Sequence, residues 1–104
     1  MDIVFQGHHA HVSPRLHGRA EQGVEKLGRR IGGVVDATVR FQEDGPQRCV
    51  SVELHAAGGR RFVAEGRGRF FGPALAVALS KINAQIGHVK RTPKAKARWL
   101  ARAS

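Results

Sequence analysis

Three neighbouring segments alternate apolar and polar residues with a period of two, and this pattern constrains the fold most. Apolar residues occupy every second position in segments 35–41, 50–56 and 62–64. The turn-forming sequences DGPQ (44–47) and GG (58–59) separate these segments. Strands that alternate in this way bury one face of a sheet and leave the other in water. We therefore predict an antiparallel meander of three strands with one open face.

A strand and a helix are expected before this meander. The segment DIVFQGH (2–8) alternates in the same way and predicts the first strand. Apolar residues then recur every three to four positions from Leu16 to Ile31, which is typical of an amphipathic helix. Ser13 suits the N-cap of this helix and Pro14 its first position, because proline has no N–H to satisfy there.

A second helix completes the predicted domain. Gly72 suits its N-cap and Pro73 its first position, and Pro93 ends it by keeping the preceding residue out of helical geometry. Its predicted buried stripe consists of Leu75, Leu79, Ile82, Ile86 and Val89. The order β-α-β-β-β-α leaves two apolar helix faces and one half-buried sheet face. These pack most economically with both helices on one face of a four-stranded sheet. We predict this α+β fold, which is double-stranded-RNA-binding-like with an extra leading strand.

The net charge of +10 comes from one part of the chain. Residues 1–58 contain seven Lys or Arg and seven Asp or Glu. Residues 59–104 contain eleven Lys or Arg and a single acid, Glu65. This asymmetry is typical of a protein that binds a polyanion. Nucleic acid is the first expected partner and an anionic membrane the second. We divide the chain into a binding domain, residues 1–92, and a basic tail, residues 93–104.

The residue pattern indicates a binding protein and not an enzyme. The serines and the GRG at 66–68 lack the surroundings of a nucleophile elbow or a nucleotide loop. We therefore expect no catalytic residue, no cofactor and no small-molecule substrate. The single cysteine, Cys49, fits a reducing cytosol, and we expect an inert thiol at an outward strand position. No apolar run approaches the ~20 residues of a membrane span, so we expect a cytoplasmic protein without a membrane partner.

The sequence HHAH (8–11) is the one tempting metal motif. His9 and His11 would point the same way in an extended chain, so two ligands are geometrically possible. No paired Cys, Asp or Glu completes a recognisable site. We expect a solvent-exposed loop without a metal.

Basic side chains are the better candidates for function. Lys81 and His88 share one face of the second helix, and Arg19 accompanies other cations on the first. The predicted RNA-binding residues are Lys26, Arg29, Arg30, Lys81, His88, Lys90, Arg91 and Lys94. Arg29 and Arg30 have a second interpretation, because cations also stabilise the C-terminal end of a helix. In the tail, Trp99 either stacks on an unpaired base or packs back on the domain.

The succession of several short motifs resembles one known family. These motifs are the opening DIVFQGHH, the EKL of the first helix, the AEG closing the fourth strand, and SKINAQI in the last helix. They resemble the short form of the ribosome hibernation-promoting factors. That family is also called ribosome-associated inhibitor A, ribosomal subunit interface protein or sigma-54 modulation protein. The resemblance covers about residues 1–92, and by position Lys26, Lys81 and Lys90 match lysines common in the family.

The resemblance implies a stress factor that binds the small ribosomal subunit. Members of the family lodge in the channel of messenger and transfer RNA, silence translation, and use no cofactor. For this chain we therefore expect ribosomal RNA as the partner and a monomer when the protein is free. The alternative is a general RNA- or DNA-binding accessory protein with the same fold but no ribosomal site.

Overall fold

The computed structural model describes residues 1–8 and 12–91, with the backbone alone for His8 and residues 89–91. The elements are β1 (Asp2–His8), α1 (Pro14–Ile31), β2 (Val34–Asp44), β3 (Gln47–Ala56), η1 (Ala57–Gly59), β4 (Arg61–Gly68) and α2 (Phe71–Arg91). This order confirms the predicted β-α-β-β-β-α arrangement and its α+β class. As predicted, the Ser13 hydroxyl caps α1 by accepting a hydrogen bond from the Leu16 N–H, 3.2 Å away.

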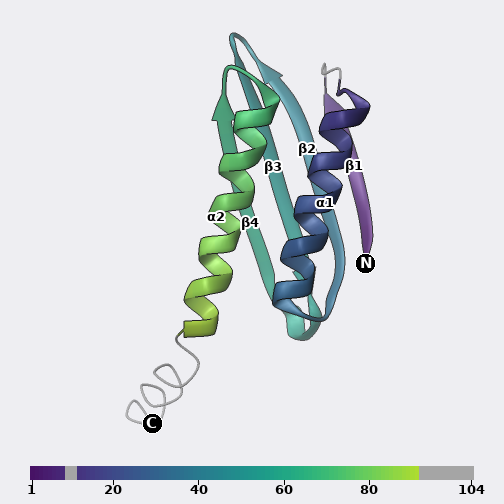
Figure 1. Ribbon diagram of the computed structural model, residues 1–104, viewed down its shortest axis with the longest axis vertical. Helices are drawn as coiled ribbons and strands as arrows, with labels where there is room; N and C mark the ends of the chain where they lie inside the picture. The colour runs from purple at the N-terminus through teal and green to yellow at the C-terminus, as the bar shows by residue number, and fades with distance from the viewer. Residues whose placement is uncertain (9–11, 92–104) are drawn as a thin grey trace.

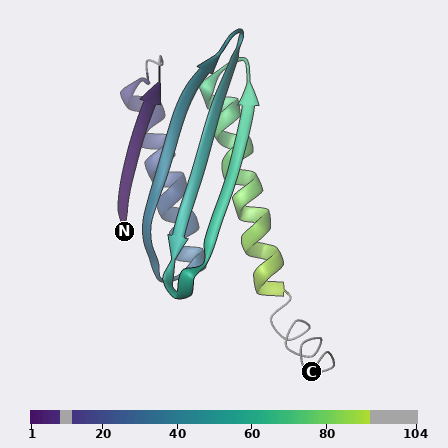
Figure 2. The same cartoon turned by 180° about the vertical axis from the view of Figure 1, so that it is seen from behind.

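The four strands form a single sheet in the order β1-β2-β3-β4. β1 pairs with β2 in parallel, whereas β2, β3 and β4 pair antiparallel. Figure 1 shows α1 and α2 side by side on one face of the sheet, and Figure 2 shows the opposite face uncovered. Both helices begin at the same end of the sheet and run in the same direction (Figure 1). The helices and sheet therefore form two layers, as the patterns predict.

The core fills the space between these two layers. The largest fully buried side chains are Phe41, Leu54, Leu75, Ile82, Ile86, Val24, Val39, Val50 and Val52. They come from alternate positions of the strands and from one stripe of each helix. In the predicted stripe of α2, Leu79 is half-buried and the Val89 side chain lies outside the described residues. Burial of this apolar surface drives the assembly of the layers.

One glycine sets how closely α2 approaches the sheet. A methyl group on Gly66 of β4 would collide with the Ala74 carbonyl oxygen and lie 2.8 Å from the Ala78 nitrogen. Only a residue without a Cβ leaves room for the helix backbone at this position. Gly66 therefore holds α2 tightly over β4.

Two strand residues differ from the alternation. Val35 is predicted on the covered face, but it is 59% exposed. The pairing of β2 with β3 shifts between Val34 and Asp36, and such a bulge turns the strand end over. Cys49 lies on the outward side of β3 but is only 6% exposed, because it is flanked by Gln42 of β2 and Arg67 of β4. The predicted outward thiol is therefore covered by its neighbours.

α2 begins two residues before the predicted Pro73. The Ala74 N–H donates to the Phe70 carbonyl at 3.2 Å, so the helix includes Phe71. The Phe71 ring packs edge-on against Phe41, with 5.5 Å between ring centroids. This anchor in the core extends the helix, and Pro73 remains in the first turn, where its missing N–H needs no partner.

Candidate nucleic-acid interface

Four basic side chains line the flank of α1 that faces α2. Arg15, Arg19, Lys26 and Arg30 are spaced by four, seven and four residues, which places them on one side of a helix. Arg15 and Arg19 border a hollow at the start of α2, and Lys26 and Arg30 border a second hollow near its middle. We call these two hollows together the α1–α2 groove.

The two acids of α1 lie on its other flank. His17 contacts Phe5 of β1, with 3.7 Å between the ring centroids, so this flank is turned toward β1. Glu21 and Glu25 follow His17 by four and eight residues and share its side of the helix. α1 is therefore basic toward α2 and acidic toward β1, and the acids are directed away from the groove.

All salt bridges among the described residues join side chains of the sheet. The pairs are Arg48–Glu43, His55–Asp36, His55–Glu53, Arg61–Glu53, Arg67–Asp44 and Arg67–Glu65. Within the same residues, five cations have no hydrogen bond or ion pair, namely Arg15, Arg19, Lys26, Arg29 and Arg69. Three of the four arginines in the strands are thus paired with carboxylates, whereas Arg40 bonds only to the neutral Gln6 and the cations of α1 have no carboxylate partner in the described part of the chain.

Arg30 connects the two helices without losing its charge. Its guanidinium donates to the side-chain oxygen of Asn83 and, at 3.1 Å, to the Asn83 carbonyl. Both acceptors are neutral, so the positive charge of Arg30 stays in the groove. Arg29 is exposed beside it. The structure therefore places Lys26 and Arg30, each predicted to bind RNA, at the same hollow.

Two predicted residues of α2, Lys81 and His88, lie on a different surface. Lys81 Nζ donates to the Glu65 carbonyl at 2.9 Å, and Gln85 Nε2 donates to the Val63 carbonyl at 2.8 Å. β4 is an edge strand, so these bonds satisfy carbonyl groups that no further strand pairs. His88 follows Lys81 by seven residues and shares this side of α2. Lys81 and His88 therefore flank β4 and do not line the α1–α2 groove.

Several sequence predictions fall outside the described residues. These are Lys94, the tail 93–104 with Trp99, and the histidines at 9 and 11. Lys90 and Arg91 belong to the last turn of α2, but their side chains are not described. Among the residues that are described, no three His, Cys, Asp or Glu side chains cluster as metal ligands. No helix in this part of the chain is long and apolar enough to cross a membrane.

Arg15 and Arg19 were not among the predicted contacts, although the groove is lined by both. The available signal was their spacing relative to Lys26 and Arg30, which puts all four on one helical flank. The sequence shows that spacing, but it does not show which flank faces α2. That orientation depends on how α1 packs on the sheet.

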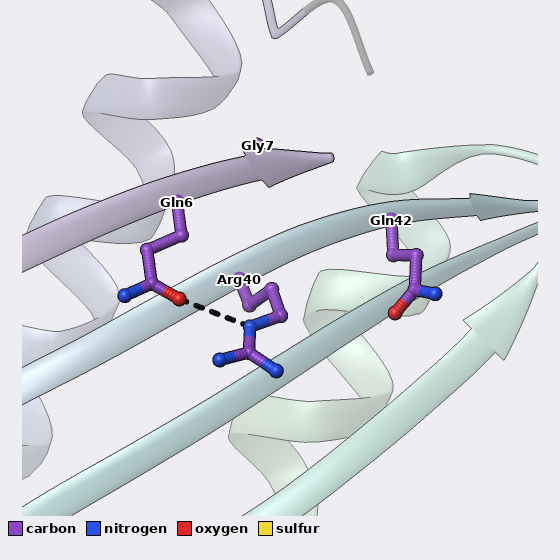
Figure 3. A pocket seen from close by; sticks show the side chains of 4 residues that line it. All are labelled: Gln6, Gly7, Arg40 and Gln42. Carbon is purple, nitrogen blue, oxygen red and sulfur yellow. Dashed lines mark hydrogen bonds between the residues drawn. The ribbon is translucent and has the colours of Figure 1, made fainter. Parts of the chain in front are cut away.

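A polar hollow on the uncovered sheet face is the other candidate. It is lined by Gln6, Gly7, Arg40 and Gln42, from β1 and β2 (Figure 3). Arg40 Nε donates to Gln6 Oε1 at 3.0 Å, and Gln42 lies beside them on the same face (Figure 3). This hollow contains one cation, whereas the α1–α2 groove contains four. The groove is therefore the stronger site for a polyanion.

The fold and groove define a small α+β domain whose helical layer carries unpaired positive charge. The chain belongs to the family described as Sigma 54 modulation protein / S30EA ribosomal protein, whose model matches residues 3–94. This match confirms the resemblance seen in the sequence.

Two solved structures have the same fold. A ribosomal subunit interface protein from Coxiella burnetii superimposes with a TM-score of 0.70 at 18% identity, covering 88% of this chain and 99% of that one. The N-terminal domain of Protein Y from Thermus thermophilus gives a TM-score of 0.71 at 17% identity, covering 83% and 96% of the two chains. Comparison with curated proteins gave no match.

Proposed function

We propose that this protein is a ribosome-associated translation inhibitor, a hibernation factor that acts under stress. It binds ribosomal RNA of the small subunit in the channel of messenger and transfer RNA. Membership of the S30EA ribosomal protein family supports a ribosomal partner. The Coxiella burnetii protein with this fold is named as a ribosomal subunit interface protein, which supports the same partner.

The row of unpaired cations in the α1–α2 groove carries the proposal. From Arg15 to Arg30 the row extends about 22 Å along α1, at 1.5 Å per residue. That length spans several phosphates of an RNA backbone. Because α1 turns its acids toward β1, no carboxylate of this helix opposes an anion in the groove. Lys26, Arg29 and Arg30 contact phosphates here, and Arg15 and Arg19 extend the contact.

The α2 residues form a second set of contacts in this proposal. Lys81, His88, Lys90 and Arg91 bind RNA from the side of β4 and the end of the helix, and Lys94 continues into the tail. Residues 1–92 act as the binding domain and residues 93–104 as a basic extension. The protein acts in the cytoplasm as a monomer that occupies a site on the ribosome, without catalysis or a cofactor.

Co-sedimentation with purified ribosomes tests the proposal. By analogy with duplex DNA, each phosphate contact contributes about 0.9 to the steepness of the log–log plot of affinity against salt, so one lost contact costs roughly eightfold near 0.1 M salt. We expect Lys26→Glu to weaken ribosome binding by at least this factor. Arg40→Glu on the open sheet face makes the same charge change and should have less than half that effect on the logarithm of affinity.

Small subunits and an unrelated duplex RNA, compared at one salt concentration, separate this function from general RNA binding. We expect a clear preference for the subunit. Equal affinity for both would replace the proposal with a general RNA-binding accessory protein. Equal losses from Lys26→Glu and Arg40→Glu would show that the groove is not the interface.

A further inference from the structure

Phe70 is the most exposed large apolar side chain in the described part of the chain. It is 70% exposed, whereas the next, Val35, is 59% exposed. It lies between β4 and α2, and its neighbour Phe71 turns inward onto Phe41. Phe70 belongs neither to the buried core nor to the partly buried side chains that pack against it. Its ring is therefore available to a partner.

The backbone on both sides of Phe70 is held in place. Two residues before it, Gly68 pairs with Arg48 of β3. Its own carbonyl accepts the Ala74 N–H that begins the hydrogen bonding of α2. The adjacent Phe71 is anchored in the core. The exposed ring is thus presented by a fixed segment, which lowers the entropy lost on binding.

Unpaired cations lie in this segment and in the neighbouring first turns of α1. Arg69 is exposed and, within the described residues, has no hydrogen bond or ion pair. Arg19 Nη1 lies 3.5 Å from the point where a methyl group on Gly72 would be, and Arg15 borders the same hollow. The first turns of both helices contain no acid. An apolar ring beside cations suits a partner that has a planar ring to stack on Phe70 and negative charge to pair with the cations.

We propose that Phe70 stacks on an unpaired nucleobase of single-stranded RNA, while Arg15, Arg19 and Arg69 bind the adjoining phosphates. Bases in a duplex hide their faces against one another, so an exposed ring selects unpaired bases. This inference deepens the proposed function, on which it rests for the choice of RNA as partner. In this proposal, one end of the α1–α2 groove, where both helices begin, is specific for single-stranded RNA.

The test measures binding of a short labelled oligoadenylate and of a blunt RNA duplex of equal length, at one salt concentration. Stacking on one base increases affinity by about 5- to 160-fold. We expect Phe70→Ala and Phe70→Leu to lose single-strand affinity in this range, and Phe70→Trp to retain it. Duplex affinity should stay within about twofold, because the cations are unchanged. Val63→Ala, which removes a 48% exposed side chain from the sheet face, is the control and should change neither.

A spectroscopic readout keeps the test independent of folding effects. In a Trp99→Phe background, Phe70→Trp places one indole at the proposed contact, and its fluorescence should be quenched by oligoadenylate. An unchanged spectrum, or equal losses for single strand and duplex in Phe70→Ala, would overturn the proposal. If Phe70→Leu binds as the wild type does, the surface fits an apolar protein segment and not a base.

Ribosome sedimentation in parallel separates the two proposals. Wild type that fails to sediment with ribosomes, but binds oligoadenylate through Phe70, refutes the ribosomal function and supports stacking. If the wild type sediments with ribosomes but Phe70→Ala and Phe70→Leu bind oligoadenylate as tightly as the wild type does, only the stacking proposal is refuted.

Discussion

Lys81 of α2 donates a hydrogen bond from its ammonium group to the carbonyl oxygen of Glu65 in β4, over 2.9 Å. The bond satisfies a carbonyl group of the edge strand that no further strand pairs, and it directs Lys81 away from the α1–α2 groove. Lys26, its counterpart in α1, has no partner among the described residues. The two lysines therefore differ in how much they contribute to stability.

This difference predicts separate outcomes for the two lysine variants. Lys81→Ala removes one hydrogen bond and should lower the free energy of unfolding by about 1 kcal/mol. Lys26→Ala removes none and should change it by less than about 0.5 kcal/mol while weakening RNA binding. Urea unfolding of both variants, beside RNA titrations, checks this. Equal stability of the two would show that the bond to Glu65 contributes nothing measurable.

Gly66→Ala should be strongly destabilising. The added methyl group would overlap the Ala74 carbonyl and force α2 away from β4, and overpacking of this kind costs about 1–3 kcal/mol or more. Gly68→Ala is the matched control, because its methyl group would lie 3.7 Å from the nearest atoms, an ordinary contact. We expect a much lower melting temperature for Gly66→Ala than for Gly68→Ala. Similar values would mean that α2 shifts without cost.

Ile82 should be a stability residue with no direct part in RNA binding. Its side chain is fully buried, and Ile82→Ala should cost roughly 2–5 kcal/mol through lost burial and the cavity left behind. Val77, which is 40% exposed on the same helix, provides the control, and Val77→Ala should cost less than about 0.5 kcal/mol. Denaturant unfolding measures both. Comparable losses would contradict the packing of α2 described above.

Stability should depend on pH through His55. The pKa of His55 is raised above its ordinary value of 6.5. The main cause is a hydrogen bond between His55 Nδ1 and Asp36, 2.6 Å long, and further interactions with Asp36 and Glu53 add to it. The folded state therefore binds a proton more tightly than the unfolded state. Its stabilising contribution is complete below pH 6.5 and is lost as the pH rises through the raised folded pKa.

Melting temperatures of wild type and His55→Gln across this pH window test the linkage. The difference in favour of wild type should be largest on the acid side of pH 6.5 and shrink toward alkaline pH. His17→Gln serves as the comparison for a histidine in a different setting. A difference between wild type and His55→Gln that is constant with pH would exclude this linkage.

The sequence by itself determined the elements and their buried faces. Ala37, Val39 and Phe41 alternate, and Val24 and Leu27 recur at helical spacing, because side-chain direction follows the local backbone period. Capping at Ser13 is equally local. The exceptions, Val35 and the start of α2 at Phe71, arise where a bulge or a core contact overrides the local pattern.

Only the tertiary structure decided which charges act together. Lys26 and Lys81 are equivalent in the sequence as basic residues of amphipathic helices, yet one lines the groove and the other covers β4. The rotation of each helix about its axis is set by the whole core, including the close approach at Gly66. Likewise, Arg61 pairs with Glu53 and Arg67 with Asp44 through strand register, which brings distant residues into contact. A sequence specifies how many charges a chain has, but their pairing depends on distances between side chains, and those distances exist only once the layers have packed.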